Sequence, residues 1–346
     1  MAGKVRKMIF SISVCILAFL LVNGLAFMYQ YDPEWLHRSG GMTRGVYIPQ
    51  SRIIINDEGN GYGIIDDNGY ANCHAVLDEN YMLVFGNSQS NGHNVHYSKT
   101  YVYLLNRMLG ALEKSYIYNV SNGGYTICDI VKGFKAGITE FPNSEGVIIQ
   151  IGSTDFDLDT MVASLNQREY SDKDSVSYLM ENRSFKDKVV GTVKNYFPLF
   201  TIIAGEKYPK LDKGIDNVFC SASHKAGDEE IYESKKYKEV LSQAFTTMRA
   251  EYDGKVTILY LPLISIENSG MVIEYDVSFE DFVDICSEFD FEVVDMGEKY
   301  LEYYKVDYSV PYGFSNTAPG RGHLNNKGHE MVAQALLDVV NEVRKK

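Results

Sequence analysis

Apolar and polar positions follow two different periods along residues 81–346, and together they predict an α/β domain. Five short runs are almost continuously apolar, as in buried strands: 81–85, 116–120, 146–151, 256–261 and 291–295. Three other runs, within 101–108, 237–248 and 332–343, carry apolar residues at helical spacing. Buried strands that alternate with helices indicate a parallel sheet covered on both faces.

The N-terminal segment has a different pattern, because residues 8–29 contain no charge and are rich in Ile, Leu, Val and Phe. At about 1.5 Å per residue, such a helix matches a bilayer core of about 30 Å. Three cations lie within residues 4–7, so the positive-inside rule places the short N-terminus in the cytoplasm and the body outside. Cleavage after Ala26 by a signal peptidase remains an alternative. The length of the run favours a single-pass membrane anchor at residues 1–30.

The remaining chain divides into two parts. Residues 31–80 are rich in Gly, Asn, Asp and Tyr, with β-type patches at 45–49 and 52–55, and predict a stalk with short strands packed on the body. Residues 81–346 form the main domain. Within it, the polar, Tyr- and Lys-rich stretch 156–235 interrupts the strand–helix rhythm and predicts a helical insertion between the third and fourth strands.

Composition narrows the possible partners. The net charge is −13, and an acidic body repels phosphate backbones, which argues against nucleic-acid binding. A neutral or cationic substrate, or a sugar polymer, fits this charge better. The four cysteines beyond the anchor allow three disulfide pairings, and their spacing matches no zinc site; they are Cys73, Cys128, Cys220 and Cys286. A free, buried cysteine is the default interpretation of each.

The most informative motif is Gly86-Asn87-Ser88-Gln89-Ser90, directly after the first strand. It places the Ser88 hydroxyl at the carboxyl end of a strand, the edge where open α/β sheets bind ligands. A helix that begins at Ser88 would point its free N–H groups at whatever Ser88 attacks. The fifth position is Ser90 rather than Gly, which argues against the nucleophile elbow of α/β-hydrolases. Taken alone, a serine at the end of a strand is more often a helix N-cap than a nucleophile.

A histidine near the C-terminus supplies a candidate base. His323 precedes the final amphipathic helix, with Asn325 or Asn326 as the predicted cap. From this loop it could reach the same sheet edge and act as general base for Ser88. A capping or surface role is the alternative, whereas His329 falls inside the helix and is predicted to be structural.

Small and polar residues follow the second and third strands and predict an oxyanion site. Gly124 and Thr154 lie in these two segments, where backbone N–H groups and a hydroxyl could face a developing negative charge. Ordinary turn chemistry is the alternative. The alternating acids Asp155, Asp157 and Asp159 do not form an EF-hand, because the required Gly and Glu are missing. No metal site and no organic cofactor are expected.

These motifs resemble those of the SGNH/GDSL hydrolase family over roughly residues 80–343. Ser88 matches the nucleophile of that family, Gly124 the glycine of its second block and His323 its base. The resemblance implies a flavodoxin-like three-layer α/β/α sandwich with a central parallel sheet of about five strands, and an oxyanion hole that includes the Ser88 and Gly124 amides. Asn87 stands in place of the family's Asp in the first block.

Two further departures concern the chemistry. Thr154 stands where the family has its oxyanion Asn, and Gly320 stands where an Asp should precede His323. Without that Asp we expect a Ser88–His323 dyad, with a backbone carbonyl or a distant carboxylate holding the histidine tautomer.

The sequence therefore predicts a membrane-anchored serine esterase outside the cytoplasmic membrane, without cofactor, acting on an acyl, especially acetyl, ester of a cell-envelope carbohydrate. An O-acyltransferase of the same fold is one alternative. A degenerate carbohydrate-binding or assembly component is another, and the protein partners stay open.

Overall fold

The computed structural model describes residues 2–29, 33, 35–38, 45–73, 76–199 and 232–345. Its centre is a five-stranded parallel sheet in the order β11-β8-β7-β5-β6. The strands are β5 (Val76–Phe85), β6 (Lys114–Asn119), β7 (Ser144–Ile151), β8 (Lys255–Tyr260) and β11 (Phe291–Asp295). Numbered along the chain, this is the flavodoxin-like order 2-1-3-4-5. The predicted fold class and all five predicted strands are confirmed.

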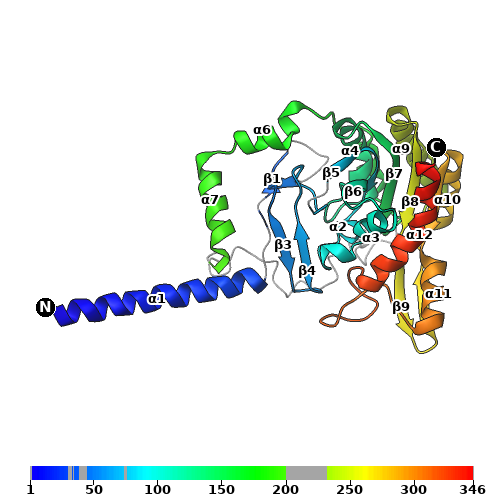
Figure 1. The fold of residues 1–346 in the computed structure, drawn as a ribbon. Helices are drawn as coiled ribbons and strands as arrows, with labels where there is room; N and C mark the ends of the chain where they lie inside the picture. The colour runs from blue at the N-terminus through cyan, green and yellow to red at the C-terminus, as the bar shows by residue number, and fades with distance from the viewer. Residues whose placement is uncertain are drawn as a thin grey trace.

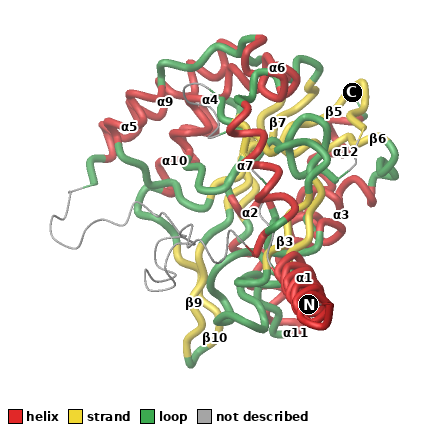
Figure 2. The backbone as a smooth tube through the Cα atoms, turned by 90° about the vertical axis from the view of Figure 1, so that its left-hand side faces the viewer, coloured by secondary structure: helices red, strands yellow, loops and turns green. Residues whose placement is uncertain are grey.

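Helices cover both faces of this sheet (Figures 1 and 2). Side chains alternate along β5, so Leu83 and Phe85 enter one apolar core while Met82 and Val84 enter the other. The first core also contains residues of α4 (Ile127–Glu140), α9 (Ser234–Glu251) and α10 (Phe279–Glu288). The second contains residues of α3 (Tyr101–Met108), α11 (Gly297–Asp307) and α12 (Asn326–Arg344). The three predicted helices correspond to α3, α9 and α12.

The segment before β5 forms short antiparallel pairs. β1 (Trp35–Leu36) pairs with β2 (Val46–Tyr47), and β3 (Arg52–Ile55) pairs with β4 (Gly61–Ile64). These strands include the two β-type patches predicted from the sequence. A further hairpin, β9 (Leu263–Glu267) with β10 (Gly270–Glu274), was not predicted.

Short helical elements complete the domain. α2 (Ser88–Asn91) and η1 (Tyr97–Lys99) follow β5. After β7 come α5 (Leu158–Ser164), η2 (Asp172–Asp174), α6 (Val176–Glu181) and α7 (Phe185–Tyr196), a helical stretch inside the predicted insertion. The rest of that insertion, including Cys220, lies largely outside the described residues. Within the described residues, Cys73, Cys128 and Cys286 form no disulfide, and the last two are buried.

The helix α1 (Ala2–Tyr29) projects away from the body (Figure 1). Among the described residues, its segment Gly3–Met28 is the one helix long and apolar enough to cross a membrane, and only 6% of its most apolar window is buried. A signal sequence has the same length and composition. The C-terminal end of α1 reaches the body of the protein, where Asn56 Nδ2 donates a hydrogen bond to Met28 O (3.3 Å).

Candidate active site

Ser88 lies at the carboxyl end of β5 and is the first residue of α2. The preceding Asn87 is the N-cap: its side chain accepts a hydrogen bond from Gln89 N (2.9 Å), while its own N–H donates to Gln150 Oε1 (3.2 Å). Asn87 therefore performs a capping task that either Asn or Asp can perform. The cap turns the chain sharply and leaves the half-buried Ser88 at the edge of the sheet.

His323 joins Ser88 to a carboxylate that the sequence did not identify. His323 Nε2 lies 2.9 Å from Ser88 Oγ, and Nδ1 lies 2.6 Å from Glu58 Oε2. The backbone N–H of His323 donates to the other carboxylate oxygen, Glu58 Oε1 (2.6 Å). The three side chains form a continuous Ser–His–Glu relay, the arrangement of a catalytic triad. Of the two ways considered for holding the histidine, the distant carboxylate is the one present.

Glycines around this contact explain how Glu58 approaches. A Cβ on Gly322 would lie 2.0 Å from Glu58 Oε1, and Gly322 has a left-handed φ of +85°, so a side chain there would displace the carboxylate. The Gly-rich run around His323 thus makes room for a carboxylate from another part of the chain. This explains why Gly320 can stand at the position of the family's adjacent Asp.

The loop that carries Glu58 is held from two sides. Asn316, just ahead of the His323 loop, accepts from Gly59 N (2.9 Å) and donates to Asn56 O (3.2 Å). Asn94 Nδ2 donates to Glu58 O (3.1 Å). Both contacts tie the β3–β4 connection to the loops of the main domain, so Glu58 is positioned by its backbone as well as by His323.

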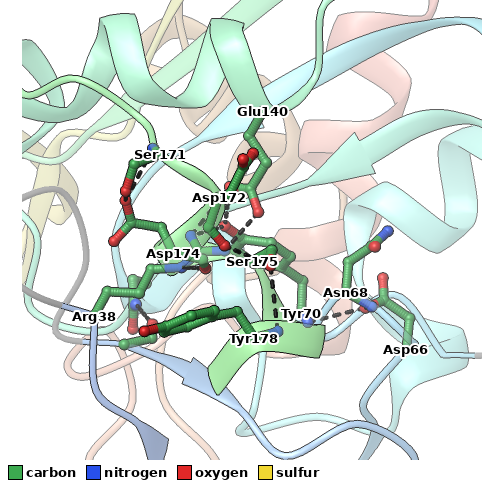
Figure 3. A network of polar contacts seen from close by, with 12 residues as sticks. Arg38, Asp66, Asn68, Tyr70, Glu140, Ser171, Asp172, Asp174, Ser175 and Tyr178 are labelled. Atoms are coloured by element: carbon green, nitrogen blue, oxygen red, sulfur yellow. Dashed lines mark hydrogen bonds and ion pairs between the residues drawn. The ribbon is translucent and has the colours of Figure 1, made fainter. Parts of the chain in front are cut away.

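A second network of hydrogen bonds attaches the segment before β5 to the rest of the protein through Arg38 and Tyr70 (Figure 3). Arg38 forms two hydrogen bonds with the Glu140 carboxylate (2.5 and 3.0 Å), and its Nε donates to Asp174 O (2.8 Å). Tyr70 OH donates to Glu140 Oε2 (3.1 Å). Burial favours the neutral form of Glu140 and raises the pKa of its carboxyl, although Arg38 opposes this effect. These contacts hold Arg38 and Tyr70, which precede β5, against Glu140 at the end of α4 and against η2.

The protonation of Glu58 follows from its surroundings. Burial alone would raise the pKa of this carboxyl, but the hydrogen bonds and the attraction of His323 outweigh burial and lower the pKa below its usual value. Glu58 is therefore ionised at neutral pH, as a group must be that stabilises an imidazolium.

The side chain of Gln89 holds in place the loop that carries His323. Its Oε1 accepts from Leu324 N (2.7 Å) and its Nε2 donates to Gly322 O (3.3 Å), so one buried side chain bonds to the residues on both sides of His323. This role is not predicted from the sequence, because a glutamine next to Ser88 carries no signal of its long-range partners. The predicted cap of the next helix is correct: Asn325 accepts from Lys327 N and Gly328 N.

Of the predicted oxyanion residues, Ser88 and Gly124 line the pocket, whereas Thr154 is buried beside it. Gly124 lines the same pocket as Ser88 and His323, and its φ of +77° is a left-handed conformation that glycine adopts without strain. Neither the Ser88 nor the Gly124 amide has a hydrogen-bond acceptor within the described chain. Thr154 is fully buried, and its hydroxyl is hydrogen-bonded to Ser278 Oγ (2.8 Å) and Asp276 (3.2 Å). Its hydroxyl therefore serves the adjoining loop, and its oxyanion role stays a prediction.

The site opens into a pocket of about 450 Å³. Apolar and aromatic side chains line part of it, and acidic and uncharged polar side chains line the rest; among them are Tyr125, Ile127, Phe156, Leu261 and Tyr312, with Asp155, Asp157 and Asp276. Carboxylates accept hydrogen bonds from hydroxyl groups, and aromatic rings pack on apolar faces of a ligand. The pocket suits an uncharged, hydroxyl-bearing ligand with a small apolar part.

Two other histidines near the site are not part of the relay. His329 is buried in α12, where its Nδ1 accepts from Tyr101 N (3.2 Å), which confirms the structural role predicted for it. Burial, assisted by repulsion from His323, lowers the pKa of both His93 and His329 to about 3. Both are therefore neutral, and His323 is the histidine in contact with Ser88.

Comparison with known proteins gives matches of overall chain path only. No protein-family model matches the chain, and no curated protein matches its sequence. Among solved structures, the chain is similar to TesA (14% identity, TM-score 0.40), covering 76% of this chain and 99% of that one. It is also similar to an acetyl xylan esterase, AlAXEase (13%, 0.41, 75% and 99%). A putative lipolytic protein of the G-D-S-L family from Desulfitobacterium hafniense DCB-2 matches at 9% identity and a TM-score of 0.34 over 76% and 99%.

Because these similarities are low, the fold is assigned from the order of the strands, and the candidate site is assigned from the distances between its side chains. Both agree with the resemblance read from the motifs: the sheet has the flavodoxin-like order, and Ser88, Gly124 and His323 meet at its carboxyl edge.

Proposed function

We propose that this protein is a serine esterase of SGNH type, anchored in a membrane by α1. The observation that carries the proposal is the relay Glu58–His323–Ser88, with contacts of 2.6 and 2.9 Å, at the mouth of a pocket. A helix cap or a surface histidine requires no such alignment, and neither requires a half-buried carboxylate on the far side of the ring.

The geometry supports acyl transfer through a covalent intermediate. His323 Nε2 accepts the proton of Ser88 as Oγ bonds to the acyl carbon, and the carbonyl π electrons move to the oxygen. The amides of Ser88 and Gly124 are the proposed donors to that oxyanion. When the tetrahedral intermediate collapses, the C–O bond to the alcohol breaks and His323 gives its proton to the leaving oxygen. Water, activated by His323, then releases the acid and restores Ser88.

Glu58 has a separate task in this scheme. Its carboxylate accepts a hydrogen bond from Nδ1–H, which leaves Nε2 unprotonated and able to accept the Ser88 proton. It also stabilises the imidazolium that forms in the transition state. The proposed mechanism is therefore a triad rather than the dyad expected from the sequence.

For the substrate we propose an acetyl or other short acyl ester of a carbohydrate on the outer side of the membrane. Three acids in the pocket can accept hydrogen bonds from sugar hydroxyls, and the net charge of −13 disfavours anionic substrates. A sugar hydroxyl could replace water in the last step, which would make the protein an O-acyltransferase.

The test uses a fluorophosphonate probe, which labels an activated serine. We expect the full chain in detergent to be labelled and to hydrolyse 4-nitrophenyl acetate, and we expect Ser88→Ala to lose both properties. Ser121→Ala is the matched control, because Ser121 also follows a sheet strand but its hydroxyl donates to Val84 O (3.2 Å). A folded protein that is never labelled would support the binding component instead.

A further inference from the structure

The helix α7 exposes a row of large apolar side chains, and none of its described residues belongs to either of the two main apolar cores. Phe185 is 83% exposed, Tyr196 66%, Val189 44% and Val193 40%. These positions are separated by three or four residues, so they share one side of the helix. If it stayed exposed to water, this apolar side would promote aggregation, and a contiguous apolar surface of this kind marks an interaction site.

The charges around this apolar side are the reverse of those of the whole protein. Residues 183–196 contain Arg183, Lys186, Lys188 and Lys194 and a single acid, Asp187, whereas the chain has a net charge of −13. A helix with one apolar side and a cationic remainder is typical of helices that lie in the surface of an anionic bilayer.

The C-terminal end of α7 contacts α1. Asn23 of α1 donates to Tyr196 O (2.9 Å) and accepts from Leu199 N (3.2 Å), and the rings of Phe19 and Phe197 lie 6.0 Å apart. Asn23 is six residues before the end of α1, a distance of about 9 Å along the helix. That is the depth, about 5–10 Å, to which a surface helix buries its apolar side.

The orientation of α7 agrees with this depth. In Figure 1, α7 runs across the direction of α1 beside its C-terminal end, instead of continuing away from it. In Figure 2, which looks along α1 from its N-terminus, α7 lies on the viewer's side of the sheet. A bilayer crossed by α1 would therefore meet the long side of α7.

We propose that α7 is a second membrane contact, lying in the outer surface of an anionic phospholipid bilayer beside α1. The proposal rests on the membrane anchoring by α1 proposed above. Together the two helices fix the rotation of the catalytic domain, which a single anchor would leave free. The loop that carries Glu58 is itself attached to the end of α1, because Asn56 Nδ2 donates a hydrogen bond to Met28 O.

The experiment measures the depth of α7 in the full chain. Trp35 is the only tryptophan, so Trp35→Phe gives a background into which one reporter is introduced, either Phe185→Trp or Asp187→Trp. Position 187 is the matched control, because it lies about 200° around the helix from position 185. Each protein is reconstituted in nanodiscs of phosphatidylglycerol and phosphatidylcholine with brominated acyl chains, which quench tryptophan on contact.

We expect bromine to remove roughly half of the emission at position 185, with a blue-shifted maximum, and to leave position 187 almost unchanged, because only one side of the helix enters the bilayer. Position 185 is far from the α1 contact, so a helix that pointed away from the membrane would not be quenched there. In nanodiscs of phosphatidylcholine alone, we expect weaker quenching.

Absence of quenching at both positions would overturn the proposal and leave a protein partner as the occupant of this side. Equal quenching at both would overturn it as well, because the helix would then be inserted as a whole. Failure of the full chain to enter nanodiscs would instead refute the anchoring by α1 and with it this inference. Retained labelling of Ser88 in each variant shows that the domain is folded and separates these outcomes from failure of the esterase proposal.

Discussion

Replacement of Glu58 tests the part of the site that the sequence did not identify. In Glu58→Gln the side chain keeps its size and can still accept from His323 N, but its NH₂ group would face Nδ1. An N–H donor there favours the tautomer with the proton on Nε2. That tautomer cannot accept the proton of Ser88, so the base is lost although the residue His323 remains.

The magnitude follows from the contacts. Only the Glu58–Nδ1 bond strengthens when the imidazole becomes charged, and a charge-assisted hydrogen bond contributes about 1.5–3 kcal/mol. Removing it in Glu58→Ala should lower kcat by about 10- to 150-fold. Glu58→Gln adds the wrong tautomer, for which an analogous substitution in a serine protease lowers kcat by about 10⁴. We therefore expect Gln to be the more damaging replacement, with KM little changed.

The assay is hydrolysis of 4-nitrophenyl acetate by the full chain in detergent, with kcat and KM measured separately. Glu79→Gln is the matched control, since Glu79 is exposed at the start of β5, and it should behave as the wild type. Equal activity of Glu58→Gln and wild type, while Ser88→Ala is inactive, would refute the triad and restore the dyad. The reverse order, with Ala worse than Gln, would show that Glu58 acts through folding of the loop rather than through the histidine tautomer.

Two further predictions concern the support of the site. Gln89→Ala removes both hydrogen bonds that flank His323, each of which contributes about 0.5–1.5 kcal/mol. We expect kcat to fall about tenfold while KM stays unchanged. A loss of stability with full kcat in the folded fraction would assign Gln89 to folding alone. For His329, burial lowers the folded-state pKa to about 3, so the unfolded chain binds a proton first and stability falls as pH drops from about 6.5 towards 3. His329→Asn keeps an acceptor for Tyr101 N but removes the titrating group. Between pH 6 and 4.5, we therefore expect the free energy of unfolding, measured with urea, to fall less steeply with decreasing pH than in the wild type, by about 1.4 kcal/mol per pH unit. Parallel curves for the two proteins would contradict this.

The sequence by itself determined the sheet and three of the four loops that form the proposed site. Nearly continuous apolar runs predicted all five strands, because burial on both faces of a parallel sheet favours apolar residues at most positions of a strand. The sequence predicts Ser88 and Gly124 as site residues because they lie in the segments after two such strands, and His323 because it precedes a strongly amphipathic helix. Parallel strands end at one edge, which explains why Ser88 and Gly124 line the same pocket. His323 follows no such strand, and its contact with Ser88 depends on the loop before α12.

Tertiary structure alone decided the rest. Glu58 is 265 positions from His323 in a segment without periodicity, and only the packing of the β3–β4 connection on the Asn94 and Asn316 side chains brings it to the imidazole. Thr154 has the right position in the chain, yet its hydroxyl is hydrogen-bonded to Asp276 and Ser278. A strand's end is set by local pattern, whereas the partner of a side chain depends on which distant loop fills the space beside it.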